Sequence, residues 1–106
     1  ASAGFAAYNL SKASVIMLAK NQATEWGKDN VRVNVICPGL VKTKLSQMLW
    51  SNEAILKKAE RTIPMGRMAS TQEMAGLAVF LASDASSYMT GATLVNDGGI
   101  LNGALF

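Results

Sequence analysis

The segment Val31-Arg32-Val33-Asn34-Val35-Ile36-Cys37-Pro38-Gly39 decides how the rest of the chain folds. Its β-branched residues predict a strand over Val31–Cys37. Pro38 has no N–H group to continue a β-ladder, so we expect the strand to stop there. Gly39 has no side chain and therefore lets the backbone turn and approach a neighbouring segment closely.

A long helix is predicted just before this strand. Residues 6–26 are apolar over most of the helix surface, so we expect the helix to be covered on more than one side. Gly27 suits a C-terminal cap, and Asp29-Asn30 is a turn signal. A helix, a short turn and a strand in this order predict part of an α/β architecture with parallel strands.

Two short helical pieces are predicted after the strand. Thr43 can cap a piece that reaches Trp50, and Ser51 or Asn52 can begin a second piece that ends near Ala59. In α/β sheets, ligands bind outside the carboxyl ends of the strands. We therefore expect these pieces to form a lid over a substrate, with a satellite helical pair that covers the core as the alternative.

The last third of the chain contains one more helix and one more strand. Ser70-Thr71-Gln72-Glu73 is a capping box, and the apolar residues behind it recur at helical spacing. A polar loop over 84–90 leads to a short strand over 92–96, which ends at Asp97-Gly98-Gly99. The tail to Phe106 is apolar enough to dock on another surface.

The composition excludes several kinds of protein and site. Of the 106 residues 50% are hydrophobic, yet no apolar run approaches the ~20 residues that a bilayer-spanning helix needs. The net charge of +3 comes from scattered Lys and Arg residues, so we expect no nucleic-acid partner. The chain has no histidine, which excludes Ser-His-Asp and Cys-His catalysis, and its seven acidic residues do not cluster, so we predict no metal site.

The single cysteine and the start of the chain both bear on location. Cys37 can form no internal disulfide, which suits a reducing compartment. The first residues do not read as a signal peptide, so we expect none. We therefore expect a cytoplasmic protein with no membrane partner.

The pair Tyr8 and Lys12 gives the strongest indication of chemistry. Residues four apart share one face of a helix, so the phenol and the ammonium can point into one site. A neighbouring cation favours the phenolate and lowers the pKa of a phenol from its usual value near ~10. The pair therefore predicts a group that can donate and accept protons near neutral pH. The alternative is a partly exposed tyrosine packed on a lysine stem.

The predicted elements do not complete a sheet. Two parallel strands make a poor independent domain, and the strand over Val31–Cys37 would leave one apolar edge open. The sequence also begins abruptly at Ala1-Ser2-Ala3-Gly4, without a methionine. We therefore expect the chain to be the C-terminal part of a larger α/β domain.

Four features, in this order, carry a resemblance to a known family. They are Tyr8-Asn9-Leu10-Ser11-Lys12, then Val31-Arg32-Val33-Asn34 with Pro38-Gly39 and Thr43, then Met65-Gly66-Arg67 before the capped helix, and finally Thr90-Gly91-Ala92 running into Asp97-Gly98-Gly99. Over nearly its whole length the chain resembles the C-terminal half of a short-chain dehydrogenase/reductase. The resemblance implies that residues 1–106 are the C-terminal part of a single domain, a Rossmann-like doubly wound parallel sheet whose N-terminal cofactor half is absent.

The resemblance also implies an activity and a proton donor. The expected function is an oxidoreductase that transfers a hydride between NAD(P)(H) and a small or apolar carbonyl or alcohol substrate. Tyr8 would protonate the carbonyl oxygen in reduction and act as the base in oxidation. Lys12 would lower the pKa of Tyr8 and bind the nicotinamide ribose hydroxyls, and both Tyr8 and Lys12 would belong to the cofactor-binding residues. The sequence does not decide between NADP and NAD, because the residues that select the cofactor would precede Ala1.

The remaining site residues implied by the resemblance follow the strand. Pro38, Gly39 and Val41 would line the nicotinamide, with the backbone of Val41 reading its carboxamide, and Thr43 would add a hydroxyl contact. A mobile substrate loop would carry the apolar residues Leu45, Met48, Leu49 and Trp50. Their apolar character suggests a hydrophobic carbonyl or alcohol. The stretch is similar to 3-oxoacyl, alcohol and carbonyl reductases alike.

Other parts of the family's site would precede Ala1, so we expect these 106 residues to be inactive alone and the longer parent protein to be the enzyme. The missing parts are the catalytic serine, the asparagine of the proton relay and the glycine-rich phosphate turn. The alternative is a non-catalytic truncated family member that serves as an oligomerisation or structural module. A sugar-nucleotide epimerase is disfavoured, because those relatives carry a larger C-terminal substrate domain. We expect a homodimer or homotetramer that uses the helix over Tyr8–Trp26 and the tail over Leu101–Phe106.

Overall fold

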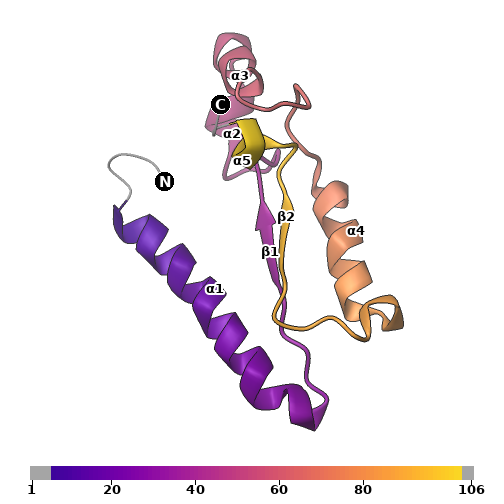
Figure 1. The fold of residues 1–106 in the computed structure, drawn as a ribbon. Coiled ribbons are helices and arrows are strands. Elements are labelled where there is room, and N and C mark those ends of the chain that lie inside the picture. Colours follow the sequence, from indigo (N-terminus) through magenta and orange to yellow (C-terminus); the bar gives the residue numbers. More distant parts are fainter. Residues whose placement is uncertain (1–5, 104–106) are drawn as a thin grey trace.

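Two parallel strands, β1 (Val35–Pro38) and β2 (Thr93–Asn96), lie between the two longest helices of the computed structural model (Figure 1). The model describes residues 6–103, apart from the side chains of Ala6, Tyr8 and Asn102. The strands pair in register from Val35 opposite Thr93 to Pro38 opposite Asn96. The connection between them carries three helices, as parallel strands require a crossover.

The helices are arranged around this pair of strands. In Figure 1, α1 (Ala6–Trp26) lies on one side of the strands and α4 (Thr71–Ala82) on the other. The short helices α2 (Gln47–Trp50), α3 (Glu53–Glu60) and α5 (Ile100–Gly103) gather near the carboxyl ends of the strands. Short 3₁₀ turns follow α1 at Gly27–Asp29 and α4 at Asp84–Ser86. The predicted α/β class with parallel strands is therefore confirmed for the described residues.

The first strand is shorter than predicted, because side chains replace part of its ladder. The Asn34 amide donates to the Met89 carbonyl at 3.0 Å and accepts from the Ala92 N–H at 3.0 Å. The Val33 N–H donates to the Thr90 hydroxyl at 3.0 Å. Residues 31–34 are thus held beside the loop before β2 without forming a strand, and β1 begins at Val35.

The end of α1 also differs from the prediction. Gly27 does not take the left-handed cap position; Asn30 does, with φ of 61°. Its N–H donates to the Gly27 carbonyl at 3.1 Å, and the next N–H, that of Val31, donates to the Trp26 carbonyl at 3.2 Å. Asparagine tolerates this conformation better than most residues, so the predicted turn signal supplied the cap.

The predicted helix starts after the strand are confirmed in part. The Asn52 side chain accepts from the N–H groups of Ala54 and Ile55, as an N-cap of α3 should. The capping box of α4 is present, with the Ser70 N–H donating to the Glu73 carboxylate at 3.0 Å. Thr43 caps a turn before α2 rather than α2 itself, because its hydroxyl accepts from the Ser46 N–H at 3.2 Å.

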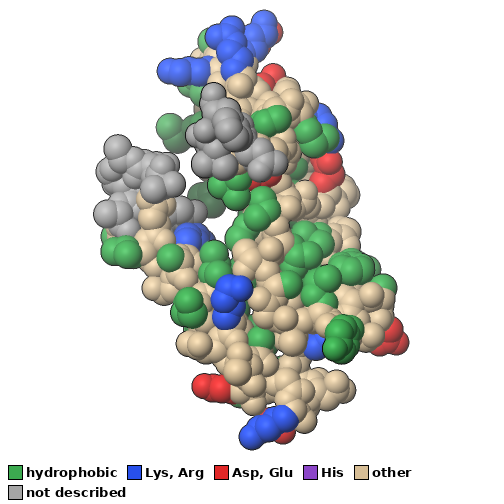
Figure 2. Space-filling model, in the orientation of Figure 1, with side chains coloured by type: hydrophobic (Ala, Val, Ile, Leu, Met, Phe, Trp, Pro, Cys, Tyr) green, Lys and Arg blue, Asp and Glu red, His purple; other side chains and the backbone are tan. Residues whose placement is uncertain are grey.

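The described elements leave much apolar surface uncovered. The chain exposes 7864 Å², whereas a compact monomer of this size exposes about 5,700 Å². Its radius of gyration is 15.8 Å, against about 13 Å for a compact domain of equal length. Hydrophobic side chains are visible along α1 on the left of Figure 2, and Leu10 and Leu18 on this helix are 69% and 54% exposed. These surfaces are available for further packing.

Helix α1 attaches to the sheet layer through small residues. Ala19 and Ala23 are its buried apolar positions. A Cβ atom at Gly91 would lie 3.5 Å from that of Ala23, so the loop before β2 packs directly on the helix. The Lys20 ammonium adds a hydrogen bond to the Gly91 carbonyl at 3.3 Å.

Of the helices that the structure describes, none is both long and apolar enough to span a bilayer.

Candidate functional site

The backbone segments that follow the two strands pack tightly against each other. The Gly39 N–H donates to the Asn96 carbonyl at 3.0 Å. A Cβ atom at Gly39 would lie 2.7 Å from the Cα atom of Asp97, which is closer than real Cβ contacts occur. The predicted close approach at Gly39 is therefore confirmed, and the neighbouring segment is the start of the Asp97-Gly98-Gly99 turn.

A cavity of about 480 Å³ lies between α1 and these strand ends. Lys12 and Asn9 line it from α1, and Pro38, Gly39 and Asp97 line it from the strand ends. The structure thus brings Lys12 to the same cavity as the predicted cofactor-binding residues Pro38 and Gly39. The side chain of Tyr8 lies outside the described residues, although its backbone belongs to α1, one turn before Lys12.

A second cavity of about 570 Å³ shares Pro38 and Gly39 with the first. Val41, Thr43 and Leu45 line it, so three more of the predicted site residues meet here. Its walls are mostly apolar, and the helix α4 contributes residues from its first turn. The predicted cofactor residues and one residue of the predicted substrate loop therefore surround the Pro38–Gly39 corner.

The other residues of the predicted substrate loop line neither cavity. Met48 is 83% exposed, and Leu49 and Trp50 are half-buried. The Trp50 indole N–H donates to the Thr43 carbonyl at 3.0 Å, so this side chain turns back toward its own loop. Of the four apolar residues in the loop, Leu45 alone lies at these cavities.

Val41 lines the second cavity, and its backbone N–H is held in a defined direction by a bridge to Ala69. Val41 pairs with Ala69 in an isolated parallel bridge, made by the Lys42 N–H to the Ala69 carbonyl and the Ala69 N–H to the Leu40 carbonyl, each at 2.9 Å. In such a bridge the N–H and carbonyl of Val41 point away from Ala69. The Ser46 hydroxyl donates to that carbonyl at 2.5 Å. Within residues 6–103 the Val41 N–H has no hydrogen-bond partner.

Ser46 is a site residue that the sequence analysis missed. Its hydroxyl accepts from the Thr43 N–H at 2.9 Å in addition to its bond to Val41, and its own N–H donates to the Thr43 hydroxyl at 3.2 Å. These bonds hold the turn that carries Thr43. A hydroxyl residue three positions after Thr43 is a recognisable local turn signal and could have revealed this pair.

Asp97 was also missed as an organiser of the site. Its two carboxylate oxygens accept from the Gly99 N–H at 2.8 Å and the Leu101 N–H at 3.1 Å. These bonds fix the start of α5, whose residues Ile100 and Leu101 form another wall of the first cavity. Within the described ranges, no three Cys, Asp and Glu side chains come together in a way that could hold a metal ion.

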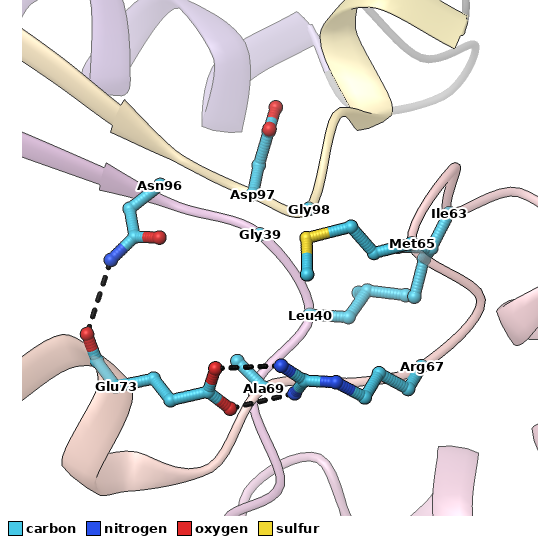
Figure 3. A pocket seen from close by; sticks show the side chains of 10 residues that line it. All are labelled: Gly39, Leu40, Ile63, Met65, Arg67, Ala69, Glu73, Asn96, Asp97 and Gly98. Carbon is cyan, nitrogen blue, oxygen red and sulfur yellow. Dashed lines mark hydrogen bonds and ion pairs between the residues drawn. The ribbon is translucent and has the colours of Figure 1, made fainter.

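An ion pair lies beside the strand ends and lines a small pocket (Figure 3). The Arg67 guanidinium donates to both carboxylate oxygens of Glu73, at 2.7 and 2.9 Å. Hydrogen bonding from Arg67, and then from the Ser70 N–H, lowers the pKa of Glu73 from 4.5 to about 2, and the same pairing raises the pKa of Arg67. The capping-box pattern predicted Glu73 as a cap but gave no sign of Arg67 as its partner.

The comparison with known proteins assigns this chain to one group. The family model described as enoyl-(acyl carrier protein) reductase matches residues 1–101. A tropinone reductase homolog of Arabidopsis thaliana is 39% identical over 104 residues, which are 97% of this chain and 39% of that protein. A ribulose-forming D-arabinitol 2-dehydrogenase of Candida tropicalis is 50% identical over 94 residues, which are 87% of this chain and 33% of that protein.

Solved structures give the same assignment. A 4-hydroxyisoleucine dehydrogenase in complex with NADH aligns with a TM-score of 0.87 at 35% identity, over 92% of this chain and 40% of that one. A gluconate 5-dehydrogenase from Burkholderia cenocepacia in complex with NADP and tartrate aligns with a TM-score of 0.84 at 34% identity, over 92% and 38%. The chain thus spans less than half the length of these relatives and corresponds to the C-terminal part of their Rossmann folds, which confirms the predicted fold class.

Proposed function

Because this chain belongs to the short-chain dehydrogenase/reductase family, we propose that the full natural protein transfers a hydride between NAD(P)(H) and a small or apolar carbonyl or alcohol substrate. The observation that carries this proposal is the cavity lined by both Lys12 and the Pro38–Gly39 corner. It supports a proton-handling residue and a dinucleotide at one site, although these positions lie far apart in the chain.

Tyr8 is the proposed general acid and base. One helical turn separates it from Lys12, which supports a shared face and a lowered pKa of the phenol. In reduction Tyr8 would give its proton to the carbonyl oxygen of the substrate, and in oxidation it would take the proton of the alcohol. Lys12 would hold the ribose hydroxyls of the dinucleotide and keep the phenol acidic.

The residues after β1 suit a nicotinamide dinucleotide, which supplies or accepts the hydride when it is bound. The Val41 N–H points away from Ala69 and is a donor for a carboxamide oxygen. Pro38 and Gly39 would form an apolar floor beside it. The Thr43 hydroxyl oxygen accepts from the Ser46 N–H and keeps a second lone pair, which could accept from the carboxamide NH₂ group. Its O–H donates to the Ser46 hydroxyl at 3.3 Å and could be turned to donate to a phosphate oxygen instead. We propose NADP or NAD without choosing between them.

The proposed substrate is a small ketone or secondary alcohol. Leu45 and the mostly apolar walls of the second cavity support an apolar substrate. Met48, Leu49 and Trp50 line neither cavity here, and we propose that their loop moves to close over the bound substrate. The relatives named as arabinitol and gluconate dehydrogenases support a small molecule with alcohol groups. The apolar substrate and the small polyhydroxy substrate have the same reacting group, a carbonyl or alcohol carbon that accepts or gives up a hydride.

A second candidate function rests on the exposed apolar surface of α1. Leu10, Met17 and Leu18 are each more than half exposed, which supports a helix that packs on another subunit. We propose a homodimer or homotetramer through α1 and the C-terminal tail, of which residues 104–106 lie outside the described part. A chain that only assembled in this way would be a structural module without turnover.

The test is an assay of the full natural protein with NADPH or NADH and a panel of small aliphatic ketones, polyols and sugar acids. The proposal predicts substrate-dependent oxidation of the reduced dinucleotide, or its formation from the alcohols. Binding of neither dinucleotide, together with a stable dimer or tetramer in light scattering, would instead support the structural module. The 106 residues alone are expected to give no turnover.

A further inference from the structure

The Arg67–Glu73 ion pair differs from an ordinary surface pair, because the two residues connect three segments. These are the loop before α4, the first turn of α4 and the end of β2. Glu73 lies in the first turn of α4, and its carboxylate also accepts from the Ser70 N–H at 3.0 Å. Its backbone carbonyl accepts from the Asn96 side chain at 3.2 Å, at the end of β2. Arg67 belongs to the loop before α4 and donates to its own neighbour, the Met68 carbonyl, at 3.3 Å.

The loop held by this ion pair is hydrogen-bonded to Leu40–Lys42, the segment proposed to face the cofactor. Ala69 lies between Arg67 and Ser70, and it makes both backbone hydrogen bonds of the bridge with Leu40 and Lys42. Val41 lies between Leu40 and Lys42, so these two bonds set the direction of the Val41 N–H. A loop that moved at Arg67 would therefore turn the Val41 N–H away from its position.

The other side of the same loop is also fixed. The Met65 N–H donates to the Gly98 carbonyl at 3.1 Å, and Ile63 and Met68 are buried. Gly98 has φ of 66°, and a Cβ atom there would lie 2.8 Å from Ile63. In Figure 3 the ion pair lies across the pocket from the turn at Asp97 and Gly98. Arg67 is thus the part of the loop whose position depends on a side-chain pair.

We propose that the Arg67–Glu73 ion pair is a positioning clamp that holds the loop at Ala69 against Leu40–Lys42 and thereby aims the Val41 N–H at the nicotinamide end of the dinucleotide. This inference rests on the proposed function. Arg67 contacts no substrate or cofactor in this account, and it acts only through Ala69 and Val41. Its effect should therefore be confined to the nicotinamide end of the ligand.

The test compares two probes in the full natural protein. One is the reduced dinucleotide that the wild-type protein binds more tightly, NADPH or NADH. The other is the matching ADP-ribose, with or without its 2′-phosphate, which lacks the nicotinamide. Arg67→Ala should raise the Kd of the dinucleotide about tenfold, which is the size of effect expected from losing one hydrogen bond to the ligand. The Kd of ADP-ribose should not change.

Matched variants separate positioning from general loosening. Lys57→Ala removes the exposed ion pair with Glu53 in α3, which lies at 3.5 Å and supports no neighbouring segment, so it should change neither Kd. Arg67→Lys keeps the charge but loses the two-pronged geometry, and it should give an intermediate Kd for the dinucleotide. If Arg67→Ala does not fold, as judged by circular dichroism, Arg67→Lys decides the question.

Each outcome has one meaning. An equal rise of both Kd values, or an unchanged Kd for the dinucleotide while the wild-type protein binds it, overturns the clamp but leaves the proposed function standing. Wild-type protein that binds neither probe overturns the proposed function and the clamp with it. A selective rise for the dinucleotide, partly recovered in Arg67→Lys, supports the clamp.

Discussion

The corner at the ends of the strands and the helix α1 are held in very different ways. At the corner, Gly39, Val41, Ser46 and Asp97 are joined by hydrogen bonds and by contacts too close for an added methyl group. Helix α1 meets the rest of the described chain mainly through Ala19, Ala23 and the Lys20 hydrogen bond. Apart from Ala13 and Ile16, which line the first cavity, most of its other apolar residues are exposed. The two regions nevertheless line one cavity.

This difference shows that the described residues fix the strand-end corner of the proposed site by their own contacts, but not the position of α1. The backbone that would contact the nicotinamide is fixed by partners within the described chain. The placement of Tyr8 and Lys12 depends on how α1 is packed, and most of the surface of α1 is exposed in the described chain. Substitutions at the corner should therefore cost stability directly, whereas substitutions on the outer face of α1 should cost little in the folded unit described here.

The largest effect on stability is expected from Gly39→Ala. Its new methyl group would lie 2.7 Å from the Asp97 backbone, which cannot move without separating the strand ends. The free energy of unfolding should fall by about 1–3 kcal/mol, as for other overpacked sites. Gly76→Ala is the control, because Gly76 lies in α4 with nothing within 4 Å of its Cβ position. There alanine should stabilise by about 0.5–1 kcal/mol, as measured by urea denaturation.

A smaller effect is expected from Ser46→Ala, compared with a serine of α1. The variant would leave the Thr43 N–H and the Val41 carbonyl without their partner, which costs about 1 kcal/mol at a half-buried position. The Ser14 hydroxyl only donates to the Leu10 carbonyl of its own helix at 2.8 Å. Ser14→Ala should therefore be neutral or slightly stabilising, since alanine is the better helix former. Equal losses in both variants would remove the contrast between the regions.

The smallest effect is the dependence of stability on pH through Glu73. Its pKa falls from 4.5 to about 2 on folding, so its pairing stabilises the folded state fully above pH 4.5, and this contribution is lost as the pH falls toward 2. Wild-type protein should exceed Glu73→Gln in its denaturation midpoint at neutral pH. The difference should shrink on acidification through this window. A difference that stays constant would mean that the carboxylate charge contributes nothing.

The sequence predicted local features well and long-range partners poorly. Helix α1 has the predicted bounds, since its apolar pattern and the Asn30 turn are local signals. The first four residues of the predicted strand were wrong, because the Asn34 side chain takes the place of ladder bonds with a loop that begins far along the chain. Polar residues that bond to distant backbone leave no periodic pattern.

In the candidate site, too, local features were predicted and long-range partners were not. Pro38 and Gly39 were predicted from local chemistry, and the resemblance supplied the residues around them. The partners Ser46, Arg67 and Asp97 were not predicted, because Ser46 and Asp97 bond to backbone groups and Arg67 to another side chain, rather than to a ligand. The convergence of Lys12 with the strand ends is a property of the fold and could not be read from residue spacing.

The central claim is that Tyr8 transfers the proton while the strand-end corner holds the dinucleotide. The most direct test is Tyr8→Phe in the full natural protein, with kcat and the Kd of the dinucleotide measured on the same preparation. We expect kcat to fall by about 10²–10⁴-fold, the usual contribution of a general acid, with the Kd unchanged. Turnover near that of the wild-type protein would contradict the assignment of Tyr8.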